Sequence, residues 1–152
     1  MQREALLLSV RPIFVDRILE GSKTAELRRV CPGVKPGQDV LIYGSSPTMA
    51  LLASAVVERV ETDAPEALWR RVRHGAGVSK AEYVSYFAGA ERAAAIWLSD
   101  VLAFERRISL HELRERWPWF RPPQSYCYVR ARIDSPNREV TSLAPRYAAR
   151  SL

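Results

Sequence analysis

The chain has 152 residues, of which 47% are hydrophobic and 26% are charged. This fits one globular domain and excludes collagen-like, low-complexity and wholly disordered proteins. The formal net charge is +6, and only three of the 23 basic residues are lysines. Because a guanidinium group can bind phosphate through two hydrogen bonds, an arginine-rich basic protein fits a nucleic-acid partner, although the same charge can serve solubility alone.

Membrane segments and metal sites are not expected. No apolar run reaches the roughly 18 residues that a membrane-spanning helix needs, and the first ten residues lack the features of a signal peptide. We therefore expect a cytoplasmic protein without membrane contact. Cys31 and Cys127 are far apart, and together with His74 and His111 they show no paired zinc spacing. We expect no disulfide, no metal and no cofactor.

The first part of the chain predicts a strand, a helix and a second strand. The strand is the apolar run of residues 5–10. Proline at position 12 and glycine at position 21 are typical of the start and the end of a helix. Residues 23–29 then alternate, with Thr24, Glu26 and Arg28 on one face, which predicts a half-buried strand.

Further strands and three helix starts follow. Strands are predicted at residues 39–43, 51–60, 93–104 and 124–133. The helix starts share a capping-box spacing, in which Asp or Ser precedes Glu by three positions; they begin at Asp63, Ser79 and Ser109. Residues 134–152 have little periodicity and predict a flexible basic tail behind a domain of residues 1–133.

These elements predict an α+β fold. Strands between residues 23 and 60 follow one another through short turns, which favours antiparallel pairing. Adjacent strands with inserted helices predict a small, mostly antiparallel β-barrel decorated by about four helices.

Three sequence blocks resemble the ASCH family, whose small domains are similar to PUA domains. The first block is GSKTAELRR (residues 21–29), which follows an apolar strand and a helix that ends at glycine. The others are VLIYGSSP (residues 40–47) and PPQSY (residues 122–126). Together the blocks span roughly residues 6 to 130 and leave the tail uncovered.

The resemblance implies a PUA-like barrel with a cleft beside the first helix and a link to RNA. Some ASCH members look like hydrolases of acetylated cytidine, and others have been proposed as ribonucleases. In the first group, a lysine works with a threonine on the same strand and a later glutamate. Lys23 matches the lysine, but the position aligned with the threonine holds Glu26, and the glutamate would fall near residues 75–77.

Lys23 is the central candidate of the first block. It lies where a helix ends and a strand begins, so the helix dipole and Glu26 could hold its ammonium at a rim. Such a lysine could bind phosphate, or act as a base if burial lowered its pKa. The alternative is a solvated turn lysine. Glu26 and Arg28 share a strand face and could orient the lysine or contact a base edge, or could form an ordinary surface ion pair.

The other two blocks offer further contacts. The Tyr43 ring could stack on a base or pack in the core, while Ser45 and Ser46 could meet a phosphate or sugar. After the Pro-Pro pair, the Gln124 amide could reach a nucleobase edge, although turn chemistry explains Ser125 equally well. In the preceding loop, Trp119 could cover the cleft.

Three hypotheses of function follow. The first is a module that binds RNA or a nucleotide in a basic cleft. The second is a small metal-independent hydrolase, a ribonuclease or an acetylcytidine amidohydrolase, in which Lys23 and Glu26 supply acid–base catalysis. The third is a regulatory protein that binds a partner through residues 64–90. The oligomeric state stays open. The candidate nucleic-acid-binding residues are Lys23, Thr24, Glu26, Arg28, Tyr43, Ser45, Ser46, Gln124, Ser125 and Tyr126.

Overall fold

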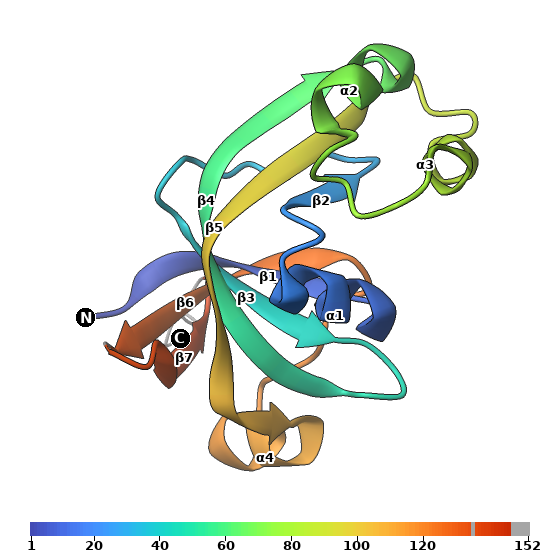
Figure 1. The fold of residues 1–152 in the computed structure, drawn as a ribbon. Coiled ribbons are helices and arrows are strands. Elements are labelled where there is room, and N and C mark those ends of the chain that lie inside the picture. Colours follow the sequence, from blue (N-terminus) through green and yellow to red (C-terminus); the bar gives the residue numbers. More distant parts are fainter. Residues whose placement is uncertain (135, 147–152) are drawn as a thin grey trace.

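The computed structural model describes residues 1–134 and 136–146 and shows one mixed sheet with helices around it (Figure 1). In chain order the elements are β1 (Arg3–Val10), α1 (Pro12–Glu20), β2 (Ala25–Arg28), β3 (Asp39–Gly44), β4 (Ala50–Asp63), α2 (Pro65–Val72), α3 (Lys80–Tyr86), β5 (Ala93–Ser109), α4 (Leu110–Arg116), β6 (Tyr126–Asp134) and β7 (Glu139–Pro145). The prediction of an α+β fold is confirmed. No helix among these elements is long and apolar enough to cross a membrane.

The seven strands form one open sheet in the order β2-β5-β4-β3-β1-β6-β7. The pair β1–β3 is parallel, and the other five neighbouring pairs are antiparallel. Because the end strands β2 and β7 are not hydrogen-bonded to each other in this order, the sheet is not a closed barrel. The predicted barrel is thus not confirmed, whereas the mostly antiparallel pairing is.

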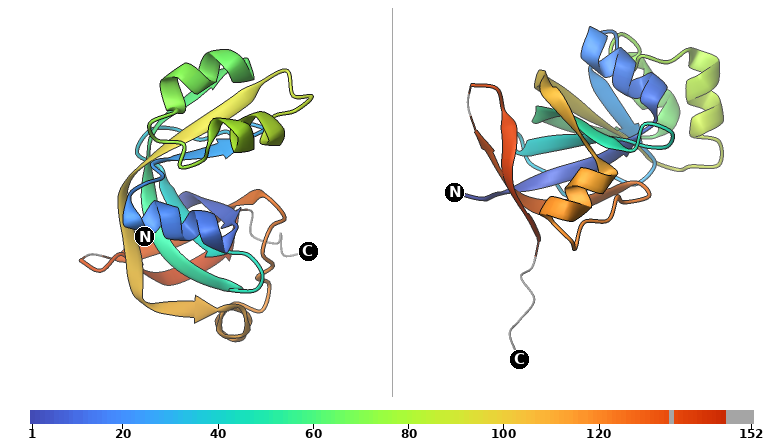
Figure 2. Two further views of the ribbon diagram at one scale, coloured as in Figure 1. Left: turned by 45° about the vertical axis from the view of Figure 1, so that its right-hand side comes forward. Right: turned by 90° about the horizontal axis from the view of Figure 1, so that it is seen from below.

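β4 and β5 are the longest strands, with 14 and 17 residues. They curve from α4 at one end of the molecule to α2 and α3 at the other (Figures 1 and 2). Their pairing has three register shifts, and bulges of this kind increase the bend and twist of a strand pair. The predicted strands at 51–60 and 93–104 were too short, because polar residues such as Thr62 and Arg106 occupy exposed positions in strands that continue past the predicted ends.

Alternating side chains divide the core between the two faces of the sheet. Leu6 and Leu8 of β1 pack with Val15 and Ile18 of α1 on one face. Their neighbours on β1, with Leu41, Phe120 and residues of α4, pack on the other. A third cluster lies under α2 and α3 and includes residues of β2 and β5. The faces of β1 therefore belong to different cores, as a strand period of two requires.

The helix ends follow the predicted signals in most cases. Gly21 follows α1 with φ of 88°, a left-handed conformation that suits glycine. Ser79 forms a complete capping box with Glu82, and the Ser109 hydroxyl accepts from the Glu112 N–H. The capping box predicted at Asp63 is wrong. α2 begins at Pro65, and the Asp63 carboxylate accepts from the Ala64 N–H while it pairs with Arg71.

The prediction of a flexible tail is wrong for residues 139–145. This segment is β7, which pairs antiparallel with β6 and buries Val140 and Leu143 in the core. Val140 and Leu143 are three positions apart, whereas residues on one face of a regular strand are an even number apart. They share a face because the pairing of β6 with β7 has a register shift at Arg132/Ile133, and the sequence therefore showed no strand alternation here. Residues 147–152 of the predicted tail lie outside the described residues.

Candidate functional site

Lys23, Glu26 and Arg28 form a buried group of charges where α1 meets β2. Their exposed fractions are 2%, 5% and 8%. The expected half-buried strand is wrong, because all four residues of β2 are buried. The apolar residues of β2 pack under α2 and α3, while Arg28 reaches across to the ends of β1 and β6. Charged groups are rarely buried to this extent unless they are paired.

The Lys23 ammonium is held by backbone and ring contacts. Its Nζ donates to the Ala76 carbonyl at 2.7 Å and lies 5.4 Å from the centre of the Phe14 ring. Burial lowers the pKa of Lys23, and Arg28 and Arg17 act in the same direction, whereas Glu26 and Glu82 oppose them. Lys23 is therefore easier to deprotonate than a surface lysine, which is the condition for an amine to exchange protons.

Glu26 and Arg28 form a pair whose hydrogen bonding is incomplete. Arg28 Nε lies 3.8 Å from Glu26 Oε1. The Arg28 guanidinium also donates to the Ser125 hydroxyl at 2.9 Å and to the Ser9 carbonyl at 3.0 Å. Glu26 Oε2 and Arg28 Nε are buried without a hydrogen-bond partner. Most buried polar atoms have a partner, so these unpartnered atoms favour a site that receives further polar groups.

The segment 75–77 closes over Lys23 because two of its residues are glycines. The Gly75 carbonyl accepts from the N–H groups of Thr24 and Ala25 at 2.9 Å. A Cβ on Gly75 would lie 2.5 Å from Thr24 Oγ1, and one on Gly77 would lie 2.5 Å from Lys23 Cβ. This is the segment where the family resemblance placed a catalytic glutamate, and here it brings the Ala76 carbonyl to the lysine instead.

Tyr43 lies elsewhere. Its exposed fraction is 2%, and its ring packs 6.1 Å from that of Phe120 in the core cluster on the face away from α1. The prediction that this ring stacks on a base beside Lys23 is wrong, and the alternative of core packing holds. The sequence could not assign the ring to one face of the sheet, because β3 is buried on both faces and its residues do not alternate. Trp119 packs on the same cluster, 5.9 Å from Phe120, and so does not cover Lys23.

The remaining predicted residues lie at the edge of the charged group or beyond it. Gln124 and Ser125 are exposed, and Ser125 contacts Arg28. Tyr126 is half-buried against the core. The Ser45 N–H donates to the Val10 carbonyl, and Ser46 is exposed. Sequence reasoning missed three residues around the charged group, because no motif contains them. The Ser9 carbonyl accepts from Arg28, the Phe14 ring lies beside the Lys23 ammonium, and the Arg17 charge acts on Lys23.

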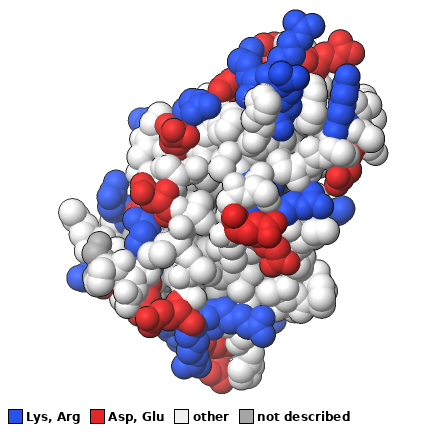
Figure 3. All heavy atoms as spheres, viewed as in Figure 1, with Lys and Arg blue, Asp and Glu red and all other residues white. Residues whose placement is uncertain are grey.

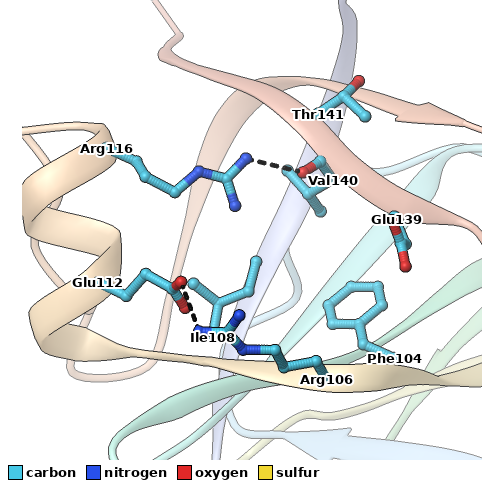
Figure 4. Close-up of a pocket in the computed structure, with 8 residues that line it drawn as sticks. All are labelled: Phe104, Arg106, Ile108, Glu112, Arg116, Glu139, Val140 and Thr141. Atoms are coloured by element: carbon cyan, nitrogen blue, oxygen red, sulfur yellow. Dashed lines mark hydrogen bonds and ion pairs between the residues drawn. The ribbon is translucent and has the colours of Figure 1, made fainter.

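Basic side chains do not form one continuous face in the view of Figure 3, where Lys and Arg alternate with Asp and Glu from the α2 end to the α4 end. A cavity of about 220 Å³ lies between β5, α4 and β7. There Arg106 pairs with Glu112, and Arg116 donates to the Val140 carbonyl (Figure 4). None of the predicted site residues lines this cavity.

Within residues 1–134 and 136–146, no three His, Cys, Asp or Glu side chains gather in a way that could hold a metal ion. Cys31 is exposed, and burial raises the pKa of its thiol. Cys127 is half-buried, and burial raises its pKa as well. Both thiols therefore favour the protonated form, which is neither a nucleophile nor a metal ligand.

Comparison with known proteins identifies related chains. The model of the ASCH domain matches residues 8–107. An ASCH domain-containing ribonuclease from Zymomonas mobilis subsp. mobilis is 33% identical over 128 residues, which cover 84% of this chain and 86% of that protein. The crystal structure of ASCH from Zymomonas mobilis has a TM-score of 0.76 at 32% identity, covering 82% of this chain and 86% of that one. A tyrosine-to-phenylalanine variant of that protein has a TM-score of 0.77 at 32% identity, covering 83% and 90%.

Proposed function

Because the chain belongs to the ASCH domain family, we propose that it binds single-stranded RNA and cleaves it. The relative from Zymomonas mobilis, which aligns with 84% of this chain, is named a ribonuclease. That likeness supports an RNA substrate. The observation that carries the proposal is the buried group of Lys23, Glu26 and Arg28, with two unpartnered polar atoms.

The group can supply the chemistry of RNA cleavage. Its Arg28 end meets the exposed Ser125, so this is where an RNA phosphate would enter and where the guanidinium would bind it. The Glu26 carboxylate would accept the proton of the attacking 2′-hydroxyl, and the Lys23 ammonium would donate a proton to the departing 5′-oxygen. The new bond joins the 2′-oxygen to phosphorus, the bond from phosphorus to the 5′-oxygen breaks, and a cyclic phosphate remains.

The test is cleavage of end-labelled single-stranded RNA by the wild type and by two variants of similar shape, Glu26→Gln and Lys23→Met. We expect each variant to lose at least about 100-fold in rate, the usual contribution of a general acid or base. Lys80 is exposed on α3, so Lys80→Met is the matched control and should keep the wild-type rate. Thermal unfolding of each variant shows that it is folded.

Two results would contradict the proposal. One is a wild type that leaves RNA intact with or without added divalent metal. The other is a Glu26→Gln variant that cleaves at the wild-type rate. Acetylated cytidine serves as a second substrate. We expect no release of acetate, because Glu26 replaces the threonine and residues 75–77 hold no glutamate.

A further inference from the structure

A second charged region lies at the opposite end of β1 from the buried group. It is a groove of about 590 Å³ lined by residues at the start of β1, by the turn at residues 33–38 and by Arg146. Of the lining residues in the described part of the chain, three are cations, Arg3, Lys35 and Arg146, and one is an anion, Glu4. The volume is in the range of small-ligand sites, and the excess of cations favours an anionic occupant.

The cations of the groove are placed in different ways. Arg146 is held in position, because its guanidinium carbon lies 4.3 Å from the centre of the Tyr128 ring and its Nε lies 3.3 Å from Glu4 Oε2. Lys35 and Arg3 are exposed, and no ion pair within the described ranges involves either of them. The groove therefore combines one oriented cation with two cations whose charge is not neutralised by a neighbouring carboxylate.

The turn adds a polar donor and a fixed shape. Gln38 lines the groove, and its Oε1 accepts from the Lys35 N–H at 3.2 Å. The Nε2 of the same amide is buried without a hydrogen-bond partner. On the other side of the turn, the Gly33 N–H donates to the Tyr128 hydroxyl at 2.6 Å, which ties the turn to β6. An occupant with acceptor oxygens would satisfy the Gln38 donor.

One face of β6 connects this groove with the buried group. Tyr126, Tyr128 and Arg130 alternate onto the same face and lie opposite Leu8, Leu6 and Glu4 of β1. Ser125, which contacts Arg28, immediately precedes this row. From Tyr126 to Arg130 the strand advances about 13 Å. Half-exposed aromatic rings beside cations are the surface that proteins use to hold single strands.

We propose that the groove of Arg3, Lys35 and Arg146 is a phosphate-binding subsite for the backbone of a single RNA strand that also reaches Arg28. The inference rests on the proposed function, since it extends the same RNA along β6. In the subsite, Lys35 and Arg146 bind backbone phosphates and Gln38 donates to a phosphate oxygen. A strand too short to span β6 does not use the groove.

The experiment measures binding of 2′-O-methyl RNA, which lacks the nucleophilic hydroxyl, so that binding is read apart from cleavage. The test variant is Lys35→Ala/Arg146→Ala, and the control Lys80→Ala/Arg107→Ala removes the same charge from other exposed positions. We expect the test variant to bind a long oligonucleotide at least about tenfold more weakly at low salt. The slope of log affinity against log salt should fall by about 1.4, or about 0.7 for each lost phosphate contact. A dinucleotide should bind the wild type and both variants equally.

Each result separates the two proposals. If the wild type binds no RNA, the proposed function fails and the subsite with it. If the wild type binds and the test variant matches the control, the subsite alone is wrong. The subsite would also be wrong if the test variant lost as much affinity for the dinucleotide or for inorganic phosphate as for the long oligonucleotide. The groove would then bind small anions and not a strand. Should the double variant unfold, Lys35→Ala alone should lower the slope by about 0.7.

Discussion

The two ends of β1 hold charges in opposite surroundings. At the Ser9 end, Lys23, Glu26 and Arg28 are buried, and the Glu26 carboxylate opposes the charges of both cations. At the Arg3 end, the cations line an open groove. A buried charge that loses its partner cannot be compensated by water, whereas an exposed charge can. The buried group should therefore be sensitive to mutation in stability, and the groove should be sensitive to salt in binding.

The largest contrast is expected when one carboxylate is removed at each end. Glu26→Ala leaves Lys23 and Arg28 buried without their counter-charge, and should lower the free energy of unfolding by about 3 kcal/mol or more. Glu4→Ala breaks an exposed pair with Arg146 and should cost less than about 1 kcal/mol. Urea unfolding of both variants measures the difference. Equal losses would show that burial does not distinguish the two regions.

A second contrast concerns the glycines near the buried group. Gly77 has φ of 64°, and a Cβ there would lie 2.5 Å from Lys23 Cβ, whereas Gly89 has φ of 78° with nothing within 4 Å. Gly89→Ala should cost about 1 kcal/mol for its backbone conformation alone. Gly77→Ala should cost about 2 to 3 kcal/mol, because the clash adds to the same strain. Equal shifts in thermal unfolding would mean that the loop 75–77 does not press on Lys23.

The pH dependence of stability reports the burial of Lys23. Burial lowers its pKa in the folded protein below 10.5, so between the lowered value and 10.5 the unfolded chain binds more protons than the folded one. The contribution of Lys23 to the free energy of unfolding therefore rises with pH across that window. Lys23→Met lacks this contribution, so the wild type should gain stability relative to this variant as the pH rises from the lowered pKa towards 10.5. For the exposed Lys80→Met variant, the free energy of unfolding should change with pH as it does in the wild type. The same parallel pH dependence for Lys23→Met would contradict the prediction.

The smallest effect on stability is expected from Glu4→Gln in the groove. Among the described residues that line the groove, Glu4 is the one carboxylate, and the change removes its charge while keeping the side-chain shape. The free energy of unfolding should therefore change by less than about 0.5 kcal/mol. RNA binding should become a few-fold tighter at low salt and lose that gain at high salt, because exposed charges are screened. Filter binding at two salt concentrations checks this. Weaker binding would indicate that Glu4 contacts the RNA or orients Arg146 for it.

Local signals in the sequence predicted the helix before Lys23 and the strand after it, but they did not predict that Lys23 and this strand are buried. Pro12 and Gly21 correctly marked the ends of α1, and the junction at Lys23 followed from them. The burial of β2 did not follow, because the residues that cover it come from α2, α3 and the end of β1. Local alternation describes only the strand itself.

The groove could not be predicted for a related reason. Its cations come from β1, from the turn before β3 and from the residue that follows β7, and more than a hundred residues separate Lys35 from Arg146. Only the pairing of β1 with β6 and of β6 with β7 brings these segments together. No motif spacing indicates that pairing, and the sequence of residues 134–152 shows too little periodicity to predict a strand.

β4 and β5 set a limit on how this protein can be divided. The two strands stay paired from the α4 end of the molecule to the α2 end (Figure 1). A cut in the middle of either strand would leave both fragments with an unpaired backbone edge and an exposed apolar surface, which promotes aggregation. The elements of the proposed RNA-binding surface should thus be studied in the intact polypeptide, because dissection into two pieces would sever the strands that both pieces require.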